Sequence, residues 1–189
     1  MPSATTQPRS IAAANIIASR AIPLVTDGSR AFQSHDPAHP DRIIWRGVGD
    51  VGAVDAAIAA AHSAFKVWSR WPIERRAEAL QACKALFTER VAQIADTLCS
   101  ETGKAMWEAE AEAKLLAAKI DVTLMQGAMS DGSGRARVTD FEISLGGTKS
   151  GRCAFRPHGV MAVLGPFNFP AHLPNGHIVP ALLAGNTIV

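Results

Sequence analysis

The segment with the clearest capacity for chemistry is an asparagine held between two aromatic residues and two prolines. It reads Gly-Pro-Phe-Asn-Phe-Pro over Gly165–Pro170. Because proline fixes φ, such a loop holds its side chains in place at a low cost in entropy. The amide N–H of Asn168 could then donate a hydrogen bond to a developing oxyanion. Asparagine is also common in turns, so Asn168 could instead bond only to neighbouring backbone groups.

The surrounding pattern places this loop at the end of a strand. Val160–Leu164 is apolar at every position, which is typical of a strand in a parallel sheet that helices cover on both faces. A helix is predicted over His172–Leu183, and Asn186–Val189 begins the next strand. Ligands of open α/β sheets bind at the carboxyl ends of the strands, so Asn168 is expected at a ligand site.

Before this unit, the sequence predicts short antiparallel strands and then a block of helices. Strands are expected at residues 22–25, 31–33 and 43–45, with a turn at Asp27–Gly28. Helices are expected at residues 50–65, with Asp50 as the N-cap, at 73–102, stopped by Gly103, and from 106 to about 129. Lys104 is expected to interact favourably with the dipole of the helix that precedes it.

The last of these helices is predicted to be amphipathic. Its apolar face carries Ala109, Ala113, Leu116, Ile120 and Leu124, and its solvated side carries Glu108, Glu110, Glu112 and Lys114. A loop rich in glycine and serine is expected at residues 127–134. An alternating strand at 138–145, a break at Gly146–Gly147 and a partner strand at 152–156 then predict a hairpin.

Composition and charge exclude several classes of function. The 189 residues carry a net charge of +2, which is too small to favour nucleic acid or a membrane surface as a partner. The longest uncharged run, Gly159–Val189, contains four prolines, so it is predicted to form strand, turn and helix rather than a membrane span. His172 and His177 lie five apart and need not share a helix face, so no metal site is predicted.

The cysteines and the N-terminus bear on the compartment. Cys83, Cys99 and Cys153 are few and far apart, which favours a reducing compartment, the cytoplasm, over a disulfide framework. Residues 1–21 contain no acidic residue, and this composition suits a targeting peptide or a disordered, loosely attached extension. We expect the extension, because compositional targeting signals are weak.

Three blocks of sequence carry a resemblance to a known family. They are Pro157–Val160 (P-H-G-V), Gly165–Pro170 (G-P-F-N-F-P) and Pro180–Thr187 (P-A-L-L-A-G-N-T). Ala60–Trp68 and Glu101–Lys104 (E-T-G-K) agree with them. In this order and at this separation the blocks resemble the aldehyde dehydrogenases, and the resemblance covers about residues 24–189.

The resemblance implies an α/β fold, an incomplete Rossmann-type cofactor-binding domain. Its strands and helices would occupy residues 22–135, an oligomerisation-type hairpin 136–156, and a first strand–helix–strand unit 157–189. In this family the matching asparagine stabilises the oxyanion that forms when a thiol attacks the aldehyde, so Asn168 is the implied catalytic residue. The implied cofactor is NAD, with NADP not excluded, and its groove would be lined by Leu164, Gly165, Pro166 and Phe167.

The resemblance also implies partners and a larger protein. The partners are a small-molecule aldehyde and, for the full-length form, further copies in a homo-oligomer. The family's nucleophilic cysteine and general-base glutamate come later than Val189, and no cysteine of this chain matches the nucleophile. We therefore expect an N-terminal fragment that is inactive alone; a non-catalytic module that associates with related subunits, or another aldehyde class, remains an alternative. Pro170–His177 resembles one branch of the family that oxidises a semialdehyde, although Phe167 replaces a frequent tyrosine and Ala171 a glycine.

Overall fold

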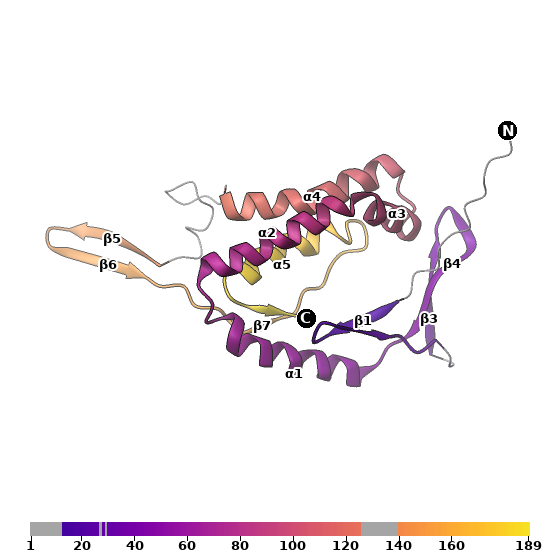
Figure 1. Ribbon diagram of the computed structural model, residues 1–189, viewed down its shortest axis with the longest axis horizontal. Helices are drawn as coiled ribbons and strands as arrows, with labels where there is room; N and C mark the ends of the chain where they lie inside the picture. The colour runs from indigo at the N-terminus through magenta and orange to yellow at the C-terminus, as the bar shows by residue number, and fades with distance from the viewer. Residues whose placement is uncertain (1–12, 27, 29, 126–139) are drawn as a thin grey trace.

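A computed structural model describes residues 13–26, 28, 30–125 and 140–189 (Figure 1). Two hairpins come first, formed by β1 (Ala14–Ile17) with β2 (Arg20–Pro23) and by β3 (Ala31–Asp36) with β4 (His39–Val48). Four helices follow: α1 (Val51–Trp68), α2 (Ile73–Glu89), α3 (Val91–Thr102) and α4 (Met106–Met125). The chain then forms a third hairpin, β5 (Phe141–Gly146) with β6 (Lys149–Cys153), and ends with β7 (Val160–Met161), α5 (His172–Leu183) and β8 (Thr187–Ile188).

The first hairpin lies partly in the stretch expected to be a loose extension. Residues 14–17 pair with residues 20–23, so ordered structure begins well before the predicted boundary at residue 22. Ala18 and Ser19 connect the strands with φ values of 50° and 62°. Two-residue hairpin turns of this kind favour Asn-Gly or Asp-Gly, so an Ala-Ser turn gives no recognisable signal. Residues 1–12, the predicted turn residue Asp27 and the predicted loop at 127–134 lie outside the described residues.

The predicted helices are present, with one additional break. The carboxylate of Asp50 accepts a hydrogen bond from the backbone N–H of Gly52 at 2.8 Å, which confirms it as the N-cap of α1. The predicted helix over 73–102 is divided into α2 and α3, because Arg90 leaves helical geometry at φ −103° and ψ 15°. Gly103 ends α3 in the left-handed conformation (φ 70°), as predicted.

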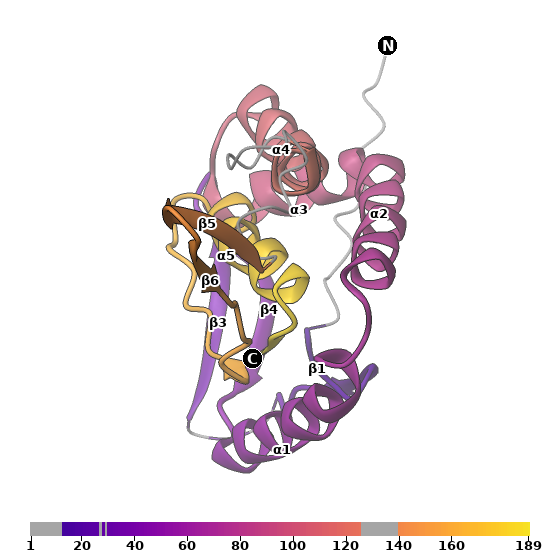
Figure 2. The ribbon, with the colours of Figure 1, turned by 90° about the vertical axis from the view of Figure 1, so that its left-hand side faces the viewer.

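Two apolar clusters hold the helices together. Leu80 of α2 packs with residues of α4 and α5, namely Ile120, Leu124, Val179 and Leu183. Ala95 and Leu98 of α3 pack against Ala109 and Ala113 of α4. The predicted apolar face of α4 is therefore confirmed, and α4 is shared by both clusters. Figure 2 shows α4 and α3 gathered on one side of α5.

The C-terminal unit is a parallel strand pair with a helix on each side. β7 and β8 pair Val160 with Thr187 and Met161 with Ile188. The predicted five-residue strand is shortened, because the chain leaves the ladder after Val163, whose N–H donates to the carbonyl of Val189 at 2.9 Å. In Figures 1 and 2, α1 lies on one side of this pair and α5 on the other. Helices lie on both sides of the pair as expected, but the predicted strand over 160–164 is only partly covered, since Val160 and Met161 are half-buried and Leu164 is 94% exposed.

The β5–β6 hairpin projects from the helical body as a long arm (Figure 1). Its apolar residues Ile143 and Leu145 are 49% and 60% exposed. Asp140 anchors its base, where the carboxylate accepts hydrogen bonds from the N–H of Phe155 and the guanidinium of Arg152. The arm thus presents apolar side chains to solvent instead of to the core.

Candidate functional site

The loop between β7 and α5 places Asn168 at the carboxyl end of the parallel strand pair. The Asn168 side chain is exposed, and no residue in the described parts of the chain forms a hydrogen bond with its amide. The structure therefore does not use Asn168 to satisfy neighbouring backbone groups, which was the alternative to a functional role. Its amide N–H is available to a ligand.

Two side chains, Lys104 and Glu112, form hydrogen bonds with the backbone of this loop. The ammonium of Lys104, just after α3, donates to the backbone carbonyl of Asn168 at 3.1 Å and to Oε2 of Glu112 at 2.5 Å. The other carboxylate oxygen, Oε1, accepts from the backbone N–H groups of Ala171 and His172, each at 3.0 Å. These N–H groups open α5, so the carboxylate also faces the positive end of that helix.

The prediction for Glu112 was wrong. Instead of lying on the solvated side of α4, it is 1% exposed. Burial on its own raises the pKa of Glu112, but the hydrogen bonds from Lys104, His172 and Ala171 outweigh it and hold the pKa below its usual value. A buried carboxylate with these partners remains charged at neutral pH.

Lys104 follows the C-terminus of α3, and the structure shows specific contacts that were not predicted for it. The side chain is 11% exposed, and Nζ lies 4.4 Å from the centroid of the Phe169 ring, within the range of a cation–π contact. Lys104 thus contacts the loop at two consecutive residues, Asn168 and Phe169.

The four residues expected to line a cofactor groove run along the same loop, on the solvent side. Leu164 and Phe167 are 94% and 90% exposed, and Pro166 is half-buried. Gly165 packs so closely against α5 that a Cβ atom placed there would clash with the ring of Pro174. Within the described residues, the backbone N–H and C=O groups of Leu164, Gly165 and Phe167 have no hydrogen-bond partner.

A hollow of about 460 Å³ opens beside Asn168. Its walls come from the loop and from α4, and include Phe167, Phe169, Trp107, Glu108 and Leu115. This volume lies in the range of small-molecule sites. Asn168, Lys104 and Glu112 all line it, so the exposed amide of Asn168 and the buried Lys104–Glu112 pair converge on one place.

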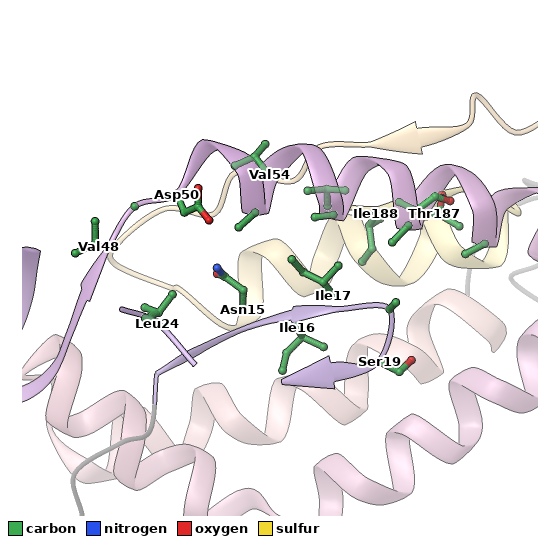
Figure 3. A pocket seen from close by; sticks show the side chains of 18 of the residues that line it. Asn15, Ile16, Ile17, Ser19, Leu24, Val48, Asp50, Val54, Thr187 and Ile188 are labelled. Carbon is green, nitrogen blue, oxygen red and sulfur yellow. The ribbon is translucent and has the colours of Figure 1, made fainter. Parts of the chain in front are cut away.

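A larger cavity of about 890 Å³ lies elsewhere, between α1, the β1–β2 hairpin and β8 (Figure 3). Ile16, Ile17 and Val54 belong to its predominantly apolar lining. It contains none of the predicted site residues. We therefore take the smaller hollow as the candidate site, because convergent polar groups identify a site better than volume does.

The first and third sequence blocks, Pro157–Val160 and Pro180–Thr187, contact each other through the side chain of Asn186. Asn186 accepts hydrogen bonds from the backbone N–H groups of His158 at 2.6 Å and Gly159 at 3.1 Å, and its amide donates to the carbonyl of Ala181 at 3.2 Å. Arg76 of α2 donates to the carbonyl of Leu183 at 2.8 Å. These contacts fix the start of β7 relative to the end of α5, and so define the two ends of the unit that carries the loop.

Comparison with known proteins decides the family. A model of the aldehyde dehydrogenase family matches residues 24–189. The chain belongs to the aldehyde dehydrogenase family. It is 43% identical to the N-succinylglutamate 5-semialdehyde dehydrogenase of Chromobacterium violaceum over 77% of this chain and 29% of that protein, and 44% identical to that of Burkholderia ambifaria over 84% and 31%. The chain spans about three tenths of the length of these relatives.

Solved structures of the family share the fold. An aldehyde dehydrogenase of Brucella melitensis biovar abortus superimposes with a TM-score of 0.76 at 25% identity, over 92% of this chain and 34% of that one. An NADP-dependent glyceraldehyde-3-phosphate dehydrogenase of Bacillus halodurans, complexed with NADP, gives 0.76 at 26% identity, over 93% and 36%. The resemblance to a branch of the family that oxidises a semialdehyde is confirmed, because relatives at 43% and 44% identity are named N-succinylglutamate 5-semialdehyde dehydrogenase.

Two further properties concern metals and membranes. Among the described residues, no group of three or more His, Cys, Asp or Glu side chains is placed to hold a metal ion. No helix in the described part of the chain is both long and apolar enough to cross a membrane.

Sequence reasoning overlooked Glu112 and the contacts of Lys104, although a signal was present. Glu112 lies three residues after Ala109 and four before Leu116, so helical periodicity places it in line with the apolar face of α4. A lone carboxylate on a buried face requires a partner. The nearby Lys104 was the cation available to supply one.

Proposed function

We propose that this chain is the N-terminal part of an NAD(P)-dependent aldehyde dehydrogenase that oxidises N-succinylglutamate 5-semialdehyde to N-succinylglutamate in arginine catabolism. The relatives at 43% and 44% identity, which bear that name, support the choice of substrate. The observation that carries the proposal is the unbonded amide of Asn168 beside a hollow of about 460 Å³.

In this proposal Asn168 is the catalytic residue of the chain. Its side-chain N–H donates to the aldehyde oxygen as negative charge develops there, at the carboxyl end of β7. A donor fixed in advance stabilises the transition state more than the ground state, because the charge is greatest in the transition state. The aldehyde carbon would lie in the hollow between the loop and α4.

The groove for the dinucleotide would run along Leu164, Gly165, Pro166 and Phe167. These residues fit such a role because the backbone groups of Leu164, Gly165 and Phe167 are unpaired and two of the side chains are exposed apolar surface. When bound, the nicotinamide accepts a hydride from the substrate. NAD is proposed as the cofactor, with NADP as the alternative.

We propose that the remaining chemistry lies in parts of the family that this chain does not span. The chain covers about three tenths of its relatives, and no cysteine lines the hollow beside Asn168 among the described residues. Cys83, Cys99 and Cys153 are free thiols, as expected for a cytoplasmic protein.

The test uses a longer polypeptide that contains this chain and the segments that match the rest of its relatives. We expect N-succinylglutamate 5-semialdehyde to have a far higher kcat/KM than acetaldehyde or succinate semialdehyde. Asn168→Ala should lower kcat by about 100- to 1000-fold, the usual cost of removing an oxyanion donor. Equal kcat/KM for the three aldehydes would contradict the substrate, and unchanged kcat in the variant would contradict the role of Asn168.

A second function is favoured by the exposed arm. Ile143 and Leu145 on β5 present apolar surface, which is typical of an interface between subunits. The chain could pair with related subunits through this hairpin, as part of a homo-oligomer or as a non-catalytic module. Sedimentation of the 189-residue chain, alone and mixed with a full-length relative, distinguishes these cases from a monomer.

A further inference from the structure

We propose that Lys104 and Glu112 are positioning residues for Asn168, and that they act on the reaction by fixing the direction of its side-chain amide. This inference rests on the proposed function, in which Asn168 donates to the oxyanion. Neither residue needs to touch substrate. Their effect would pass through the backbone of the loop.

The two residues hold the C-terminal half of the loop, from Asn168 to the start of α5. Lys104 holds the carbonyl of Asn168 at 3.1 Å, and Glu112 holds the N–H groups of Ala171 and His172 at 3.0 Å. The bond of 2.5 Å between Lys104 and Glu112 joins the two contacts into one unit. Because Glu112 is on α4, which packs in both apolar clusters, this unit is attached to a helix that is anchored in the core.

Asn168 has little else to hold it. In the described residues Lys104 is the only group that bonds to any atom of Asn168, and the amide itself has no partner. The direction of the amide therefore depends on the backbone of the loop. A displacement of about 1 Å in a catalytic group can lower a rate by about 100-fold.

A purely structural role for the same contacts is the competing explanation. Glu112 satisfies two N–H groups at the start of α5, which stabilises that helix whether or not Asn168 has any role. The two explanations predict different effects of Glu112→Gln on kcat once the Asn168 side chain has been removed. If Glu112 acts through Asn168, its replacement has no further effect on kcat in an Asn168→Ala background.

The experiment is a double-mutant cycle in the longer, catalytically complete polypeptide. Glu112→Gln keeps an oxygen for the N–H groups of Ala171 and His172 but turns an NH₂ group toward the Lys104 ammonium, which breaks the link. We expect Glu112→Gln to lower kcat by about 10- to 100-fold with little change in the KM for NAD. The double variant should lie within about twofold of Asn168→Ala alone.

Further variants guard against misfolding and nonspecific effects. Lys104→Met removes the ammonium and keeps the aliphatic chain near Phe169, so it tests the same link if Glu112→Gln does not fold. Lys104→Arg should recover most of the activity that Lys104→Met loses, because a guanidinium can reach both acceptors. The matched control is Asp121→Asn, which breaks another ion pair of α4, with Lys84 at 2.7 Å, and should leave kcat unchanged.

The outcomes separate this inference from the proposed function. Unchanged kcat in Asn168→Ala would overturn both. A large loss in Asn168→Ala, with Glu112→Gln either neutral or fully additive to it, would overturn only the positioning role. A loss in Glu112→Gln that disappears in the Asn168→Ala background is the result that supports it.

Discussion

Asn186 shows how one buried side chain can determine the path of two segments. Its side-chain oxygen accepts hydrogen bonds from the N–H groups of His158 and Gly159, and its NH₂ group donates to the carbonyl of Ala181. The residue is 4% exposed. We predict that Asn186→Ala lowers the free energy of unfolding by roughly 2–4 kcal/mol, because it leaves the buried N–H of Gly159 and the partly buried N–H of His158 without acceptors. Urea unfolding of the 189-residue chain measures this. Asn168→Ala, at an exposed asparagine, is the control and should change stability little.

Glu112 gives a prediction for pH. Its pKa is lowered in the folded chain, so its contribution to stability is present above the ordinary glutamate range, about pH 4.3, and is lost as pH falls through the lowered pKa. The difference in unfolding free energy between the unmodified chain and Glu112→Gln should be constant near neutral pH and shrink in acid. Carboxylates common to both proteins cancel in this comparison. A difference that does not change with pH would mean that the Glu112 charge adds nothing to stability.

Asn168 and Glu112 differ in how well the sequence predicted them. Asn168 lies in a compact motif beside two prolines, and local sequence was enough to place it in a loop after a strand. Glu112 depends on contacts with residues 171 and 172, which are about 60 positions away and come together only when α5 packs on α4. Charge alone predicted an exposed side chain, whereas its position on the helix indicated burial.

At the scale of elements, the packing of the loop on α5 can be tested through Gly165. A Cβ atom at this position would clash with the ring of Pro174, which cannot rotate away. We predict that Gly165→Ala destabilises the chain by about 1–3 kcal/mol, the usual cost of overpacking. Gly176→Ala, within α5 itself, is the matched control. Its Cβ would lie 3.9 Å from Lys119, so the change should be neutral or stabilising. Thermal unfolding of both variants measures the difference in stability. Equal unfolding temperatures for the two variants would mean that a small backbone shift relieves the clash.

Helices were predicted more accurately than strands, for physical reasons. The predicted helix over 172–183 matches α5, and the apolar spacing of α4 identified its buried face, since a helix pattern is local. The β1–β2 hairpin was missed because its Ala18–Ser19 turn adopts positive φ without glycine or asparagine. The break at Arg90 was missed for the same kind of reason, as no proline or glycine marks it.

At the scale of the whole molecule, the order of the elements could be predicted and their arrangement could not. The sequence predicted a final strand–helix–strand unit, and β7, α5 and β8 form it. It did not predict that α1 would contact the far side of this unit, where the hydroxyl of Thr187 donates to the carbonyl of Ala61 at 3.0 Å. Such contacts join residues more than 120 positions apart, and no local pattern encodes them.

The distribution of thiols leads to a prediction for the whole chain. Burial raises the pKa of the Cys83 thiol, which makes it a poor nucleophile, and Cys99 packs beside the cluster shared by α3 and α4. Cys153 lies on the projecting hairpin. None of the three lines the hollow beside Asn168, so within the described residues the proposed oxyanion donor has no cysteine nucleophile beside it.

We therefore predict that the purified 189-residue chain forms no NADH when given N-succinylglutamate 5-semialdehyde and NAD, whereas a longer polypeptide that also matches the rest of its relatives does so. The measurement is NADH absorbance at matched concentrations. The triple variant Cys83→Ser, Cys99→Ala and Cys153→Ser, made in the longer polypeptide, should retain activity if the nucleophile comes from outside this chain. If the 189-residue chain did turn over, and the same three substitutions made in that chain abolished its turnover, the nucleophile would be among these cysteines and the chemistry would have to be reassigned within the chain.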